Sequence, residues 1–148
     1  MQIVIGKLSE LNWQMTFEYF QLRSAIFVVE QQCVYLDMDD ADKEATHILG
    51  LSESGKVVAG TRVLNGESAT QCHIGRVVVA KSHRGSGLGK AIMEASHVWC
   101  KEHFAHLSEI HISAQVYLEQ FYASLGYIIT GPVYLEDGLP HQEMVRTV

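Results

Sequence analysis

Residues 77–90 read VVVAKSHRGSGLGK, an apolar run followed by a glycine-rich turn and then by a helical pattern. The glycines alternate at Gly85, Gly87 and Gly89, which leaves the backbone N–H groups of the turn uncovered by side chains. Together with the N-terminus of the helix predicted from Leu88, these groups form a favourable place for an anion. We therefore expect the order strand, turn and helix, and a ligand that carries phosphates.

Two common phosphate-binding motifs do not fit this segment. A Walker A loop requires a glycine where the sequence has Arg84, and Ser or Thr where it has Ala91. A dinucleotide-binding G-x-G-x-x-G motif that starts at Gly85 would need a glycine in place of Lys90. The strand before the turn is also expected in an antiparallel meander, and not in a βαβ unit.

The elements around this segment are predicted from hydrophobic periodicity and from turn residues. The expected strands cover residues 3–5, 47–51, 56–64, 71–80 and 110–114, and a closing pair, 127–133 and 142–148, around Asp137-Gly138. Three helices are expected. The first is capped by Ser9, and its apolar face consists of Tyr19, Leu22, Ile26 and Val29. The second begins at Leu88, and the third is a short helix before Gly126 with Leu118, Phe121 and Leu125 on its apolar face. Residues 37–44, DMDDADKE, are predicted to form an exposed loop, because so many charges resist burial.

Three segments carry a resemblance to a known family. RGSGLG at 84–89 resembles the R/Q-x-x-G-x-G/A loop of the GNAT family of N-acetyltransferases, and FYASLGY at 121–127 looks like its FYxxxGF segment. The segment YLEDGLPH at 134–141, with residues 22–37, resembles the ElaA-like branch. The resemblance implies one α/β (α+β) domain over residues 1–148. It would have a mixed, mostly antiparallel sheet of six to seven strands, about four helices, and a splay between strands 4 and 5.

The resemblance implies that acetyl-CoA is the bound cosubstrate. The backbone of Val77 and Val79 would pair with its pantetheine arm as an added strand does. Many family members have an Asn just past the fifth strand, where this chain reads Gln115-Val116-Tyr117. The N–H groups that would hold the pyrophosphate belong to Arg84, Gly85, Ser86, Gly87, Leu88, Gly89 and Lys90.

Acetyl transfer to an amine needs groups for three tasks. The resemblance implies that the N–H of Val79 polarises the thioester carbonyl and that Tyr122 protonates the leaving thiolate, although Tyr122 also fits a core aromatic with a satisfied hydroxyl. A base is useful because an alkylamine is mostly protonated at pH 7. The candidate bases are Glu30, His73, His111, Glu136 and His141, among which we favour Glu30 and His141.

Two functions follow from this reading. The first is direct transfer of acetyl to a primary amine of a small-molecule or peptide acceptor in a ternary complex. The alternative is a non-catalytic acyl-CoA-binding sensor or interaction module. The carboxylates of the 37–44 segment would either attract a cationic amine or form a solvated loop without a ligand. They are Asp37, Asp39, Asp40 and Asp42.

Composition limits the partners further. Eleven basic and seventeen acidic residues give a net charge of −6, the wrong sign for a nucleic-acid-binding protein. The three cysteines suit reduced thiols. No signal peptide or membrane-spanning run is visible, so we expect a cytoplasmic location and no membrane partner. No metal is expected, because Cys100, His103 and His106 lack a fourth ligand. A homodimer would fit the family, whose exposed late strands often pair between subunits.

Overall fold

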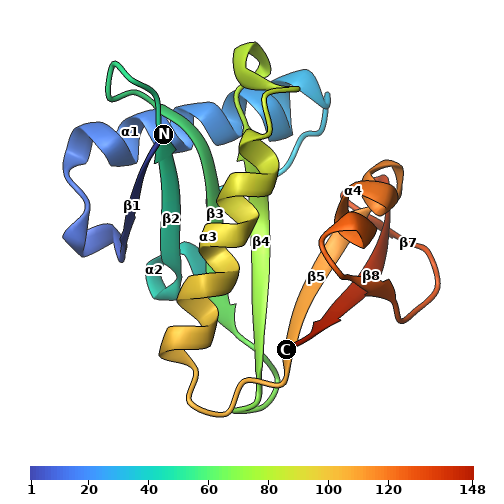
Figure 1. Ribbon diagram of the computed structural model, residues 1–148. Helices are drawn as coiled ribbons and strands as arrows, with labels where there is room; N and C mark the ends of the chain where they lie inside the picture. The colour runs from blue at the N-terminus through green and yellow to red at the C-terminus, as the bar shows by residue number, and fades with distance from the viewer.

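The computed structural model describes residues 1–148 as one eight-stranded sheet with helices on both faces. The sheet has the order β1-β2-β3-β4-β5-β8-β6, and β7 also pairs with β8 (Figure 1). The strands are β1 Gln2–Gly6, β2 Thr46–Leu51, β3 Val57–Asn65, β4 Gln71–Val79, β5 Glu109–Gln115, β6 Ile128–Ile129, β7 Tyr134–Glu136 and β8 Leu139–Thr147. The α-helices are α1 Trp13–Arg23, α2 Ala41–Glu44, α3 Leu88–His103 and α4 Glu119–Ser124.

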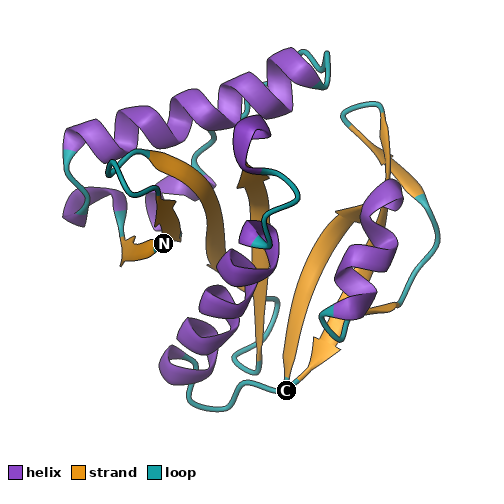
Figure 2. Ribbon diagram, turned by 45° about the horizontal axis from the view of Figure 1, so that its top comes forward, coloured by secondary structure: helices purple, strands orange, loops and turns teal.

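The sheet is splayed between β4 and β5, as the resemblance implied. These strands are the parallel pair in a sheet that is otherwise antiparallel, and they pair only from Gln71↔Glu109 to His73↔His111. Beyond His73 they diverge, as Figure 2 shows near the middle of the molecule. The splay divides the sheet into a half with β1–β4 and a half with β5–β8.

Helices α1 and α3 cover opposite faces of the first half (Figure 1). Successive side chains of a strand point to opposite faces, and β2 illustrates this at Ile48 and Leu49. Ile48 belongs to the main core with Ile92 of α3, whereas Leu49 packs in a smaller core with Tyr19 of α1. None of the helices combines the length and apolar character needed to cross a bilayer.

The closing strands differ from the prediction. The expected strand 127–133 is limited to β6, because Gly131 and Pro132 follow and both residue types disrupt strands. The hairpin partner of β8 is the separate strand β7, and the turn between them is at Asp137-Gly138 as expected. This interruption is why the sheet has eight strands and not six or seven.

The first helix also differs from the prediction. Its N-cap is Asn12, whose Oδ1 accepts the Met15 N–H at 2.8 Å, and not Ser9, which lies in a short 3₁₀ turn. After Arg23 the chain continues as a π-helix, η2, over Ser24–Glu30. A π-helix has i→i+5 hydrogen bonds, so the 3.6-residue periodicity fails there and Val29 is 72% exposed.

Candidate active site

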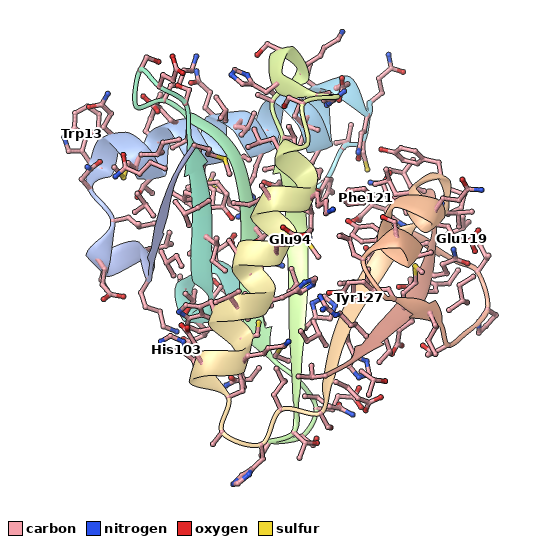
Figure 3. The ribbon with its side chains drawn as sticks, viewed as in Figure 1. Trp13, Glu94, His103, Glu119, Phe121 and Tyr127 are labelled. Atoms are coloured by element: carbon pink, nitrogen blue, oxygen red, sulfur yellow. The ribbon has the colours of Figure 1, made fainter.

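The glycine-rich turn presents an open helix N-terminus. Gly85 and Gly87 have φ values of +77° and +82°, which residues with a side chain rarely adopt. Gly87 is the N-cap of the 16-residue helix α3, and no side chain caps its first N–H groups. Gly89 approaches α4, since a Cβ there would lie 3.4 Å from Phe121 (Figure 3). The turn can therefore receive an anion on backbone N–H groups that no protein group occupies. The Arg84 N–H, which was predicted to be one of them, instead donates to the Lys81 carbonyl at 3.4 Å.

One edge of β4 is free next to this turn. The Ala80 N–H donates to the Val58 carbonyl of β3 at 2.8 Å. Because successive N–H groups of a strand alternate in direction, those of Val77 and Val79 point toward the splay. There β5 has already separated from β4. An extended ligand could pair with this edge.

Two cavities lie along the splay and share a wall. The loop cavity, about 660 Å³, extends from the glycine-rich turn along β4 to α4. The hairpin cavity, about 90 Å³, lies between β4, β5 and the β7–β8 hairpin. A larger hollow of about 1170 Å³ lies on the other side of the turn, away from the free edge of β4. The residues that line both of the first two cavities are Phe27, Gln31, Val77, Gln115, Leu118 and Tyr122.

Among the residues that line both cavities, Tyr122 is the one whose side chain can act as a general acid. Its ring is 6% exposed, and burial, with a smaller effect of Tyr117, raises the pKa of its hydroxyl. The phenol therefore keeps its proton at neutral pH. The neighbouring Tyr127 bonds its hydroxyl to His97 at 2.8 Å, whereas no residue forms a hydrogen bond with the Tyr122 hydroxyl. A core tyrosine would be expected to have such a partner.

His141 lies in the hairpin cavity, and Glu30 lies in the loop cavity. His141 stands opposite Gln115 in the β5–β8 register, which brings it close to the shared wall. Glu30 instead pairs with Arg84, with its two oxygens 2.8 and 2.6 Å from the guanidinium nitrogens. This hydrogen bond, with the charge of Arg84, lowers the pKa of Glu30, which makes its carboxylate a weak base.

The structure brings most of the predicted cosubstrate contacts to the loop cavity. Eight of the nine line it, and Ser86 faces the larger hollow. Sequence reasoning missed Phe27 and Gln31, which line both cavities. Both lie in the 22–37 segment that carries part of the resemblance, but no contact with a ligand was assigned to them, because they arrive from η2 and the residue that follows it. The eight are Val77, Val79, Arg84, Gly85, Gly87, Leu88, Gly89 and Lys90.

The acidic segment is exposed only in part: Asp39, Asp40, Lys43 and Glu44 are exposed, as expected, but Asp37 and Asp42 are buried. Asp37 and Asp42 are 4% and 3% exposed, and the segment includes the short helix α2. Arg23, itself fully buried, lies 2.9 Å from Asp37 and 2.7 Å from Asp42. Burial alone would raise the pKa of Asp42, but the hydrogen bond and charge of Arg23 lower it.

Two further arginines complete the neutralisation of this segment. Arg62 lies 2.6 Å from Asp39, and Arg76 lies 2.9 Å from Asp37. Asp40, which is exposed, pairs with Lys43 at the surface. Asp37, Asp39 and Asp42 are therefore neutralised by arginines of the fold, and Asp40 stays at the surface. This arrangement speaks against the alternative in which the segment attracts a cationic acceptor.

Of the remaining candidate bases, Glu136 lines the hairpin cavity, whereas His73 and His111 lie outside both cavities. Burial, with the nearby charge of Arg62, lowers the pKa of His73, and His111 pairs with Glu143 at 2.8 Å. Cys100 is buried, and no group of three His, Cys, Asp or Glu side chains is placed to hold a metal ion.

Comparison with known proteins identifies the family. A family model described as "Acetyltransferase (GNAT) domain" matches residues 16–148. The chain belongs to the GNAT family. Protein ElaA of Escherichia coli K12 is 38% identical over 143 residues, which cover 95% of this chain and 92% of ElaA.

Solved structures of GNAT-like proteins agree with this assignment. The crystal structure of E. coli ElaA has a TM-score of 0.89 and 36% identity, with 99% of each chain covered. An acyl-CoA N-acyltransferase from Pseudomonas aeruginosa has a TM-score of 0.88 and 31% identity, with 98% of each chain covered. An aminoglycoside 6′-N-acetyltransferase complexed with coenzyme A shares the fold, with a TM-score of 0.72 and 14% identity over 97% of this chain and 96% of that one.

Proposed function

We propose that this GNAT chain transfers an acetyl group from acetyl-CoA to a primary amine by direct transfer, while both substrates are bound. The observation that carries this proposal is the position of Tyr122 in the wall common to the two cavities. The loop cavity has an anion-binding turn at one end, which suits a pyrophosphate. The coenzyme A complex of the aminoglycoside acetyltransferase and the acyl-CoA specificity in the name of the Pseudomonas protein support this donor.

Three groups of the chain would each carry out one part of the reaction. The Val79 N–H would donate to the thioester oxygen as charge develops there. His141 would accept the proton that the amine loses as its nitrogen bonds to the acetyl carbon. Tyr122 would give its proton to the thiolate as the C–S bond breaks. We propose that Glu30 serves as the ion-pair partner of Arg84 and not as a base, and that His141 is the base.

The size of the hairpin cavity limits the acceptor. At about 90 Å³, it equals the volume of roughly three water molecules in the liquid. A narrow, unbranched alkylamine end suits a cavity of this size best. We therefore propose an acceptor that inserts a narrow primary amine, such as a lysine side chain or an aliphatic amine.

Ligand binding provides the first test. Acetyl-CoA at millimolar concentration should raise the melting temperature, because it binds the folded state only. Gly87→Val should abolish this rise, because a β-branched residue strongly disfavours the φ of +82° that opens the turn. Gly55→Val is the matched control, with the same strain at φ +83° but in the β2–β3 hairpin. A wild-type protein without a thermal shift would contradict the proposal.

Thiol release provides the second test. The protein is incubated with acetyl-CoA and a panel of aliphatic amines, amino acids, aminoglycosides and lysine peptides. Amine-dependent release of free thiol, with acetylated product by mass spectrometry, is expected for unbranched primary amines. Binding of acetyl-CoA without release for any amine would instead favour the non-catalytic sensor.

A further inference from the structure

The β7–β8 hairpin joins two of the candidate bases into one pair. The turn residues Asp137 and Gly138 both have positive φ, +52° and +78°, and Glu136 pairs with Leu139 across them. This is the geometry of a two-residue hairpin turn. It returns the chain so that the Glu136 carboxylate Oε2 lies 3.3 Å from Nε2 of His141.

The imidazole of His141 is held on three sides. Its Nδ1 lies 2.7 Å from the carbonyl oxygen of Leu139. A carbonyl only accepts, so Nδ1 carries the hydrogen and Nε2 is the nitrogen left to take up a proton. The Tyr134 ring stacks against the imidazole at an interplanar angle of 25°, and its hydroxyl bonds to Ser113. The ring is thus fixed with Nε2 toward Glu136.

We infer that Glu136 is a positioning residue for His141, and this inference rests on the proposed function. When Nε2 accepts the proton of the acceptor amine, the imidazolium that forms lies 3.3 Å from the Glu136 carboxylate, and the opposite charges stabilise each other. The carboxylate is 47% exposed and the imidazole 9% exposed, so part of this attraction is screened by water. We therefore expect a moderate contribution to turnover.

Most other titratable groups around the cavity have partners of their own or stay neutral; the exception is the Asp137 carboxylate, which has no contact with His141. Arg76 pairs with Asp37. The hydroxyl of Tyr35 also bonds to Asp37, and the thiol of Cys33 donates to the backbone carbonyl of Asp137. Tyr122 is a protonated phenol, and the Asp137 side chain also faces the cavity. Among these groups, Glu136 is the carboxylate that contacts His141.

The test compares Glu136→Gln with Glu143→Gln. Glu143 forms a similar pair with His111 on the same strand, at 2.8 Å, but outside both cavities. We expect Glu136→Gln to lower kcat/KM for the amine about 3- to 10-fold, because exposed ion pairs contribute about 1 kcal/mol. The loss should appear in kcat more than in the KM for the amine, because the carboxylate stabilises the imidazolium that forms as the reaction proceeds. Glu136→Asp should restore part of the rate, and Glu143→Gln should leave both constants unchanged.

NMR spectra at a single pH separate this inference from the proposed function. The His141 ring signals, assigned with His141→Gln, should move in Glu136→Gln and stay in place in Glu143→Gln, whatever the catalytic activity. Unmoved His141 signals in Glu136→Gln, or equal kcat for the two Gln variants, would overturn the role of Glu136. Moved signals with no amine-dependent thiol release would confirm the pair and overturn the proposed function.

Discussion

Tyr122 has a buried ring and a hydroxyl without a protein partner, at the wall between the two cavities. Tyr122→Phe should lower kcat about 100-fold, since general acids contribute at least this much. The KM for acetyl-CoA should stay within about twofold, because the phenol interacts with the thiolate mainly as the bond breaks. Steady-state kinetics of thiol release measure both quantities.

Tyr127→Phe is the matched control. It also removes one buried hydroxyl, but this hydroxyl bonds to His97 and lines neither cavity. The control should lose stability and keep its turnover. Full turnover in Tyr122→Phe would assign the acid to another group.

Arg23 is the charged residue on which the acidic segment depends most. Its side chain is fully buried between Asp37 and Asp42, so Arg23→Met leaves two buried carboxylates with fewer cationic partners. We expect a loss of about 3–5 kcal/mol in the free energy of unfolding. Lys43→Met, which removes an exposed pair with Asp40, should change it by less than about 1 kcal/mol. Urea unfolding compares the two variants.

The sequence predicted that these aspartates would be exposed, and for Asp37 and Asp42 this was wrong for a physical reason. A run of acidic residues normally remains in water unless cations reach it. The cations that do so, Arg23, Arg62 and Arg76, come from α1, β3 and β4. Local spacing holds no signal for such long-range pairs. The glycine-rich turn, in contrast, was predictable because its function depends on consecutive backbone groups.

At the scale of elements, the Glu30–Arg84 pair connects η2 to the glycine-rich turn across the loop cavity. The guanidinium of Arg84 would be a binding partner for both the Glu30 carboxylate and the pyrophosphate of acetyl-CoA, so the two anions would compete for it. Glu30→Gln should therefore tighten acetyl-CoA binding by up to about fivefold, the limit for an exposed ion pair. Arg84→Gln should weaken it about tenfold, because a charge-assisted hydrogen bond is lost.

Isothermal titration calorimetry measures both affinities. Glu102→Gln makes the same charge change at the far, exposed end of α3 and should leave the affinity unchanged. Weaker binding in Glu30→Gln would mean that Glu30 supports the bound position of Arg84 and does not compete for it.

Elements with strong periodicity were predicted well. The meander β2–β4 and helix α3 lie within a residue or two of the expected ranges, because each has a clear apolar pattern between turn residues. The irregular elements were not predicted well. The π-helix and the division of the last strands depend on tertiary contacts and on Gly131-Pro132, and periodicity alone does not detect either.

At the scale of the whole molecule, His97 joins the two halves across the splay. It lies on α3, its Nε2 is 2.8 Å from the Tyr127 hydroxyl, and Arg146 of β8 bonds to its Nδ1. In Figure 3, Tyr127 lies between α3 and the second half. Burial, with the charge of Arg146, lowers the pKa of His97 to about 4. The imidazole is therefore neutral in the folded protein at neutral pH.

This position predicts acid sensitivity. Between pH 6.5 and about 4 the unfolded chain binds a proton at His97 that the folded protein does not, so the free energy of unfolding falls as the pH decreases. We expect His97 to contribute about 2 kcal/mol to this fall. His97→Gln should reduce the slope of stability against pH in urea unfolding at pH 4.5 and 7. A slope equal to that of the wild type would contradict this role.

The π-helix has a consequence for variation in chain length. A π-helical turn contains one residue more than an α-helical turn, so deleting one residue within Ser24–Glu30 would allow continuous α-helical hydrogen bonding. The residues after the π-helix would then keep nearly their present orientation, because the residue lost is the extra one of the wide turn. Residues within Ser24–Glu30, among them Phe27, would shift around the helix axis and change the wall shared by the two cavities. A single-codon deletion here should therefore be tolerated by folding, and its effect on function should come from this turn alone.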